Sequence, residues 1–108
     1  MYLPQIDVCE RAEEIVIIAE MPGVDRQDVA IAWKDQVLTI SGRKRQQPDT
    51  NNVRYMCVER SYGPFSREIA IGIPIDYRKA RAELKNGLMR IYLPKIPPEK
   101  GQDTIPIE

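Results

Sequence analysis

The sequence contains no histidine and only two cysteines among its 108 residues. Without histidine, the chain lacks the commonest general base of enzymes and the base of the usual catalytic triads. Two cysteines far apart in sequence, Cys9 and Cys57, make a poor ligand set for zinc. These absences predict a protein that is not an enzyme and that binds no metal.

Phosphate-binding glycine loops are missing too. The six glycines form neither a GxxxxGK nor a GxGxxG pattern, so the chain has no loop of the kind that holds nucleotide phosphates. Glu13 and Glu14 are adjacent, and on a strand they would point to opposite faces, which is the wrong geometry for an acid–base pair. We therefore expect no cofactor.

An excess of charge of either sign is also lacking. Lys and Arg together number 16, as do Asp and Glu, so the formal net charge is zero. Nucleic acids and anionic membranes both bind preferentially to a basic surface, so neither is expected as a partner. The short positive runs at 43–45 and 78–81 are interpreted as solvated surface charges.

Long apolar runs are absent. The longest aliphatic run, Ile15 to Ala19, has five residues, far below the length of a membrane span. The N-terminal stretch MYLPQIDV has no signal-peptide features, and two cysteines make no disulfide framework. These observations predict a cytoplasmic protein.

What the sequence does contain is alternation of apolar and polar residues with a period of two, which is typical of β-strands. The predicted strands span residues 5–10, 14–20, 28–34, 37–42, 53–59, 65–71, 80–85 and 88–93. Asp35-Gln36 and Asn86-Gly87 are predicted to be tight hairpin turns, and a polar loop is expected over 43–52. The pattern predicts an all-β sandwich of about eight antiparallel strands.

Regular structure is expected to stop at Pro94, which divides the chain into a sandwich domain, 1–94, and a flexible C-terminal extension, 95–108. In an extended tail, Ile105 and Ile107 would project to the same side, with Pro106 between them. This end is either a frayed terminus with incidental isoleucines or a docking peptide for an apolar groove or an open strand edge. We favour the docking peptide because disordered ends seldom expose paired isoleucines.

Five short motifs occur in a fixed order along the chain. They are Pro22-Gly23-Val24, Val37 to Gly42, Glu59 to Gly63 with Phe65-Ser66-Arg67, Ala82 with Asn86-Gly87-Leu88-Met89, and Ile105-Pro106-Ile107. Together they resemble the α-crystallin domain of the small heat-shock proteins, with a bacterial- or plant-like spacing. The resemblance covers about Ile6 to Ile107, nearly the whole chain.

This resemblance implies an immunoglobulin-like sandwich that dimerises by strand exchange. The segment Val53 to Glu59 would pair with the first strand, Gln5 to Glu10, of a partner chain. The implied dimer-interface residues are Ile6, Val8, Cys9, Tyr55, Cys57, Glu59 and Arg67. Arg67 would pair with a carboxylate across the dimer, although a plain surface arginine is the alternative. Cys9 and Cys57 would lie on adjacent strands of different chains, either approaching one another or, as we favour, staying reduced and half-buried.

The resemblance also implies that the tail docks in a groove of a neighbouring dimer. The groove residues would be Val29, Ile31, Trp33, Ala80, Ala82 and Leu84. About twelve residues separate Leu93 from Ile105, which reach up to ~40 Å when extended, enough to pass between subunits. Trp33 would be core or groove wall rather than a ligand platform.

The activity implied by the resemblance is that of an ATP-independent chaperone, which binds unfolding or aggregation-prone proteins. Homodimers are expected, with higher homo-oligomers as an extension. Members of the family usually carry a long apolar arm before the sandwich, and only Met1 to Gln5 precede it here, so smaller assemblies are expected. The alternative is an adaptor of the CS-domain type that recruits a folded partner; such adaptors generally lack the Ile-Pro-Ile tail.

Overall fold

The computed structural model describes residues 1–46, 52–97 and 105–108. Seven strands and two short 3₁₀ helices make up its regular structure. In chain order they are β1 (Ile6–Glu10), β2 (Glu14–Glu20), η1 (Arg26–Asp28), β3 (Val29–Lys34), β4 (Val37–Lys44), β5 (Gly63–Ala70), η2 (Tyr77–Lys79), β6 (Arg81–Lys85) and β7 (Leu88–Pro94). No helix in the part of the chain that the structure describes is long and apolar enough to cross a membrane.

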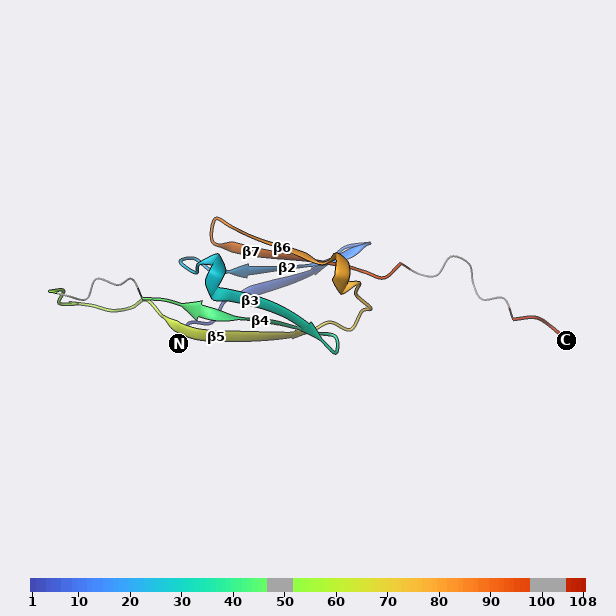
Figure 1. The fold of residues 1–108 in the computed structure, drawn as a ribbon, viewed down its shortest axis with the longest axis horizontal. Coiled ribbons are helices and arrows are strands. Elements are labelled where there is room, and N and C mark those ends of the chain that lie inside the picture. Colours follow the sequence, from blue (N-terminus) through green and yellow to red (C-terminus); the bar gives the residue numbers. More distant parts are fainter. Residues whose placement is uncertain (47–51, 98–104) are drawn as a thin grey trace.

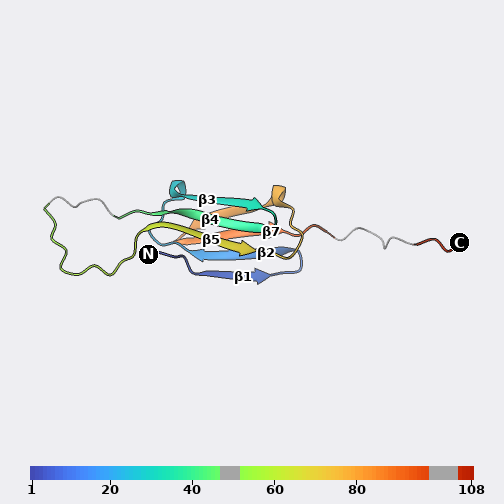
Figure 2. The ribbon, with the colours of Figure 1, turned by 90° about the horizontal axis from the view of Figure 1, so that it is seen from below.

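The strands form two antiparallel sheets that face each other (Figure 1). One sheet has the order β1-β2-β7-β6 and the other the order β3-β4-β5. Figure 2, seen from below, shows the strands of both layers running roughly along the same axis. The predicted all-β sandwich of antiparallel strands is confirmed.

The core lies between the sheets and is built from the alternating residues of β2, β4 and β7. β2 sits between β1 and β7 and is apolar on both faces, as expected of an interior strand. Ile17 lies opposite Ile91 in the β2–β7 ladder, and both are fully buried. The core cluster consists of Ile15, Ile17, Ala19, Met21, Val24, Leu38, Ile40, Phe65, Ile71, Ile75, Met89, Ile91 and Leu93.

Both predicted hairpin turns are present. Asp35 and Gln36 have φ of 50° and 63°, and Asn86 and Gly87 have φ of 54° and 76°. Two successive residues with positive φ define the turn whose twist matches that of paired strands. Packing also favours glycine at position 87, because a Cβ there would lie 3.3 Å from the Cα of Pro22, a tight contact.

The structure differs from the sequence prediction between β4 and β5. The predicted strand at 53–59 does not form, so the sandwich has seven strands rather than about eight. Figures 1 and 2 show residues 52–62 running beyond the ends of β4 and β5, where no strand of the described part of the chain lies beside them to share hydrogen bonds. The predicted loop begins later than expected, because Arg43 and Lys44 still pair with Pro64 and Gly63. Residues 47–51 of that loop lie outside the described residues.

The first residues after β7 stay attached to the sandwich. The backbone N–H groups of Lys95 and Ile96 donate to the carbonyls of Glu13 and Pro74. The Lys95 ammonium lies 2.8 Å from a carboxylate oxygen of Glu10. Residues 98–104 of the predicted tail lie outside the described residues.

One side of the sandwich, where β1 and β5 lie, is closed by the N-terminal segment. The ring of Tyr2 packs edge-on against Phe65, with 5.4 Å between centroids, and the Lys44 ammonium lies over it. Pro4 is fully buried, and its carbonyl accepts a 2.8 Å hydrogen bond from Arg67. The opposite side, between β3 and β6, has no such strap among the described residues.

Candidate edge groove

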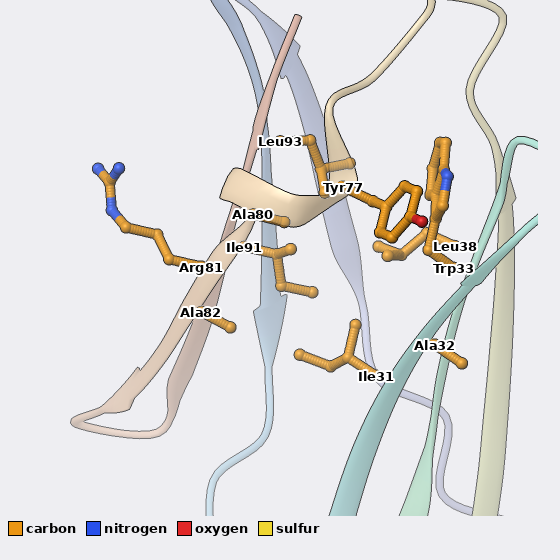
Figure 3. Close-up of a pocket in the computed structure, with 10 residues that line it drawn as sticks. All are labelled: Ile31, Ala32, Trp33, Leu38, Tyr77, Ala80, Arg81, Ala82, Ile91 and Leu93. Carbon is orange, nitrogen blue, oxygen red and sulfur yellow. The ribbon is translucent and has the colours of Figure 1, made fainter.

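The open side of the sandwich forms an apolar groove between the edge strands of the two sheets, β3 and β6. Its larger pocket has a volume of about 350 Å³ (Figure 3). The pocket is lined by Ile31, Ala32, Trp33, Leu38, Tyr77, Ala80, Arg81, Ala82, Ile91 and Leu93. Figure 3 shows Ile31 and Ile91 pointing toward the space between the sheets, whereas Arg81 points away from it.

A second pocket of about 210 Å³ continues the groove toward η1. It is lined by Arg26, Val29, Ile31, Ala82, Leu84 and Met89. Ile31 and Ala82 line both pockets, so the two are neighbours along one groove. All six groove residues predicted from the sequence line one pocket or the other, and tertiary folding brings them together.

Alternation on the two edge strands explains why the groove is apolar. On β3, the residues Val29, Ile31 and Trp33 are half-buried, while the residues between them are exposed. On β6, Ala82 lies opposite the buried Ile91, so its methyl group faces the same side as the core. A methyl group fills little of the space between the sheets, and a hollow remains there.

The sequence prediction missed several lining residues. Leu38, Ile91 and Leu93 form the floor, and their place on one face of β4 and β7 could have been found from the alternation. Tyr77 carried no such signal. It lies on η2, which is held by the N–H of Asp76 donating to the Pro94 carbonyl, a contact between residues distant in sequence.

Polar groups at the groove are few. Arg26 lines the smaller pocket, whereas the Arg81 guanidinium stacks 4.1 Å from the centroid of Tyr92 and is therefore turned away. No cluster of three or more metal-ligating side chains occurs among residues 1–46, 52–97 and 105–108. Binding in this groove would therefore be driven by apolar burial.

The predicted docking motif is fully available in the single chain. Ile105 is 85% exposed and Ile107 is 99% exposed, and Pro106 between them is exposed as well. Two exposed large apolar side chains and an apolar groove thus belong to the same chain.

The residues predicted for the dimer interface lie in two groups that one chain does not bring together. Ile6, Val8 and Cys9 belong to β1, which is an edge strand. Tyr55, Cys57 and Glu59 are all exposed on the segment beyond β4 and β5.

Arg67 and the two cysteines differ from what was expected of a single chain. Arg67 is half-buried and donates a hydrogen bond to the Pro4 carbonyl of its own chain. Its pairing across a dimer stays a prediction. Cys9 and Cys57 are free and exposed in the single chain rather than half-buried.

Known proteins resemble the chain over nearly its whole length. The profile of the Hsp20/alpha crystallin family matches residues 7–108. Heat shock protein 16 of Schizosaccharomyces pombe is 37% identical over 103 residues, covering 92% of this chain and 69% of that protein. Spore protein SP21 of Stigmatella aurantiaca is 32% identical, covering 89% of this chain. The match covers only 57% of SP21, so the chain spans little more than half of that relative.

Solved structures of heat-shock proteins also superpose on the chain over nearly its whole length. Heat shock protein 16.0 from Schizosaccharomyces pombe superposes with a TM-score of 0.86 at 32% identity, with 100% of both chains covered. A small heat-shock protein from Xylella fastidiosa superposes with a TM-score of 0.83 at 25% identity, covering 99% of this chain and 97% of that one.

Fold and groove thus define a β-sandwich of the α-crystallin kind, with one edge left open. The chain belongs to the Hsp20/alpha crystallin family, whose members are small heat-shock chaperones and not enzymes.

Proposed function

We propose that the chain is an ATP-independent chaperone that holds unfolding proteins and prevents their aggregation. The observation that carries this proposal is the open apolar groove between β3 and β6, in a chain whose family is one of heat-shock chaperones. An exposed apolar groove on a small sandwich marks a binding surface, because single soluble domains otherwise cover such surface.

Dimerisation by strand exchange is the second part of the proposal. β1 ends its sheet, so its outer edge offers unpaired backbone groups among the described residues. The segment 52–62 exposes four apolar side chains, Val53, Tyr55, Met56 and Val58. Pairing this segment with the β1 edge of another chain would give the backbone groups of β1 hydrogen-bond partners and would bury apolar side chains of the segment. In a two-fold symmetric dimer the same pairing would occur twice.

Docking of the tail into a neighbour's groove is the third part. The two pockets share a wall and could each take one isoleucine of the pair, since alternate residues of an extended segment project to one side. Burying two isoleucines yields roughly 3–6 kcal/mol before ordering is subtracted, which alone gives millimolar to tens-of-micromolar affinity. Several tails in one assembly would hold firmly through effective concentration. Assembly would therefore be reversible. The Xylella fastidiosa relative is described as having a distinct high order structure.

Chaperone activity is tested by heating a model client and following light scattering with increasing amounts of the chain. We expect suppression of scattering at about one chain per client molecule, without added ATP. No suppression at any ratio, together with capture of one folded partner, would favour the adaptor of the CS-domain type.

Tail docking is tested by replacing Ile105 and Ile107 with glycine. Native mass spectrometry should show loss of species larger than dimers. The matched control is Gln102→Gly with Asp103→Gly, which adds the same two glycines to the tail but keeps both isoleucines. If both double variants form the same species as the original chain, the tail does not hold larger assemblies together by docking in the groove.

A further inference from the structure

We propose that Cys9 of one chain and Cys57 of a second chain form a disulfide under oxidising conditions, twice per dimer, and so lock the dimer covalently. This inference rests on the strand exchange proposed above. It adds a redox-controlled cross-link to it, formed by two residues that are free and exposed in the single chain.

The position of Cys9 on β1 fixes the side to which its thiol points. Val8 pairs with Ile17 of the core, so Val8 faces the inside of the sandwich. Cys9 pairs with Val16, which is not part of the core cluster, so Cys9 faces the outer side of the sheet. The inner position of β1 is incompletely covered, since Val8 remains 48% exposed.

The alternation around Cys57 selects a matching face. Met56 and Val58 flank it and are 97% and 58% exposed. Val53 and Tyr55, on the same face as Cys57, are less exposed, at 47% and 48%. When this segment is added to the edge of β1 as a strand, the more exposed Met56 and Val58 gain the most burial by turning to the inner side, beside Val8. Successive side chains of a strand point to opposite faces, so Cys57 then lies on the outer side together with Cys9.

With Cys9 and Cys57 directly opposite each other, which is the register that this proposal requires, the distance suits a disulfide. Residues directly opposite each other in a sheet have Cα atoms about 4.5–5.5 Å apart, within the roughly 4.4–6.8 Å that a disulfide spans. The two cysteines are not joined within the single chain. Figure 2 shows β1 running away from the end of the sandwich beyond which residues 52–62 extend. The Cys57 thiol instead lies 3.8 Å from a carboxylate oxygen of Glu59, its own neighbour.

The chemistry balances with a peroxide as oxidant. One thiol loses a proton and attacks the peroxide O–O bond, which gives a sulfenic acid and water. The thiol of the other chain then attacks that sulfur, which forms the S–S bond and releases a second water. Each disulfide thus consumes one hydrogen peroxide and gives two waters, and a dithiol reductant reverses it.

Symmetry makes a further demand on the product. In a two-fold dimer, Cys9 of each chain meets Cys57 of the other, so both thiols of both chains are used. Oxidation should therefore stop at a covalent dimer and should not give a ladder of larger species.

The test uses three forms of the full chain: the original, Cys9→Ser and Cys57→Ser. Each is treated with hydrogen peroxide and run on a non-reducing gel. The original chain should convert mostly to a dimer band that dithiothreitol removes. Neither variant alone should give that band, but the two variants co-expressed should give it, because a mixed dimer still contains one Cys9–Cys57 pair.

Two readouts keep the outcomes distinct. Peptide mapping of the original dimer band must find Cys9 joined to Cys57; Cys9–Cys9 or Cys57–Cys57 bonds, or no dimer band from the co-expressed variants, would overturn the inference. Native mass spectrometry of the reduced chain reports separately on the dimer. If the reduced chain is a dimer that never cross-links on oxidation, only the disulfide is contradicted. If the reduced chain is a monomer, the strand exchange is contradicted as well.

Discussion

Trp33 and Tyr77 line the same pocket, although one lies on β3 and the other on the 3₁₀ helix η2 that precedes β6 (Figure 3). Trp33 is the single tryptophan of the chain. Its fluorescence therefore reports on this pocket alone, without contributions from other tryptophans.

Adding a peptide with the sequence TIPIE should shift the emission of Trp33 to shorter wavelength, because the docked isoleucines would displace water from the indole. Titration should give an affinity on the order of millimolar to tens of micromolar, as two buried isoleucines allow. A TGPGE peptide is the matched control and should leave the emission unchanged.

The same titration distinguishes the groove from the rest of the surface. Ala82 lines both pockets, so the larger ring of Ala82→Phe would occupy space in the groove. This variant should weaken TIPIE binding at least tenfold. Ala30→Phe, on the exposed face of β3, adds the same ring outside the groove and should bind as the original chain does. Equal binding by both variants would place the peptide elsewhere.

Gly42 is expected to be a position where even a methyl group destabilises the fold. A Cβ there would overlap the carbonyl oxygen of Asp28 and lie 2.9 Å from the Phe65 ring. Gly42→Ala should lower the free energy of unfolding by about 1–3 kcal/mol, measured by urea denaturation. Gly72 has open space around it, so Gly72→Ala should cost nothing and gain up to ~1 kcal/mol through the unfolded state. A similar loss in both variants would contradict the packing argument.

Tyr2 should make the stability sensitive to high pH. Its hydroxyl donates a 2.7 Å hydrogen bond to the Glu20 carbonyl. Burial, and secondly the negative charge of Glu20, raise the pKa of Tyr2 above its ordinary value of 10.0. The folded chain thus holds this proton more tightly than the unfolded chain. The stability it contributes is complete below pH 10.0 and is lost as the pH rises through the higher folded pKa.

The measurement compares urea unfolding of the original chain and of Tyr2→Phe at pH 9 and pH 11. The original chain should lose more stability over this interval than the variant, which has no hydroxyl to titrate at this position. If both chains lose the same free energy of unfolding between pH 9 and pH 11, the Tyr2 proton does not contribute to stability.

Local sequence determined most of the fold. The period-two alternation of β2, β3 and β7, and the turn residues at Asn86-Gly87, are short-range signals that act before any long-range contact forms. They were enough to predict the seven strands that form, the turns and the all-β class. Alternation failed at 53–59 for a physical reason: it records that a segment is suited to a strand, but a strand also needs a partner for its hydrogen bonds.

The groove could be predicted only in part. The inward faces of β3 and β6 are readable from the alternation, but their meeting was expected from a family resemblance and not from spacing, since Ile31 and Ala82 are remote in the chain. Tyr77, on η2, and the closure of the opposite side by Tyr2 and Pro4 were not foreseen.

The sequence by itself therefore determined which residues alternate, where the chain turns and that two isoleucines flank Pro106. Tertiary structure alone decided that one side of the sandwich is sealed by Tyr2 against Phe65 while the other stays open between Ile31 and Ala82. The reason is that which edges of two sheets are covered depends on contacts between residues distant in the chain, and no local pattern records those contacts.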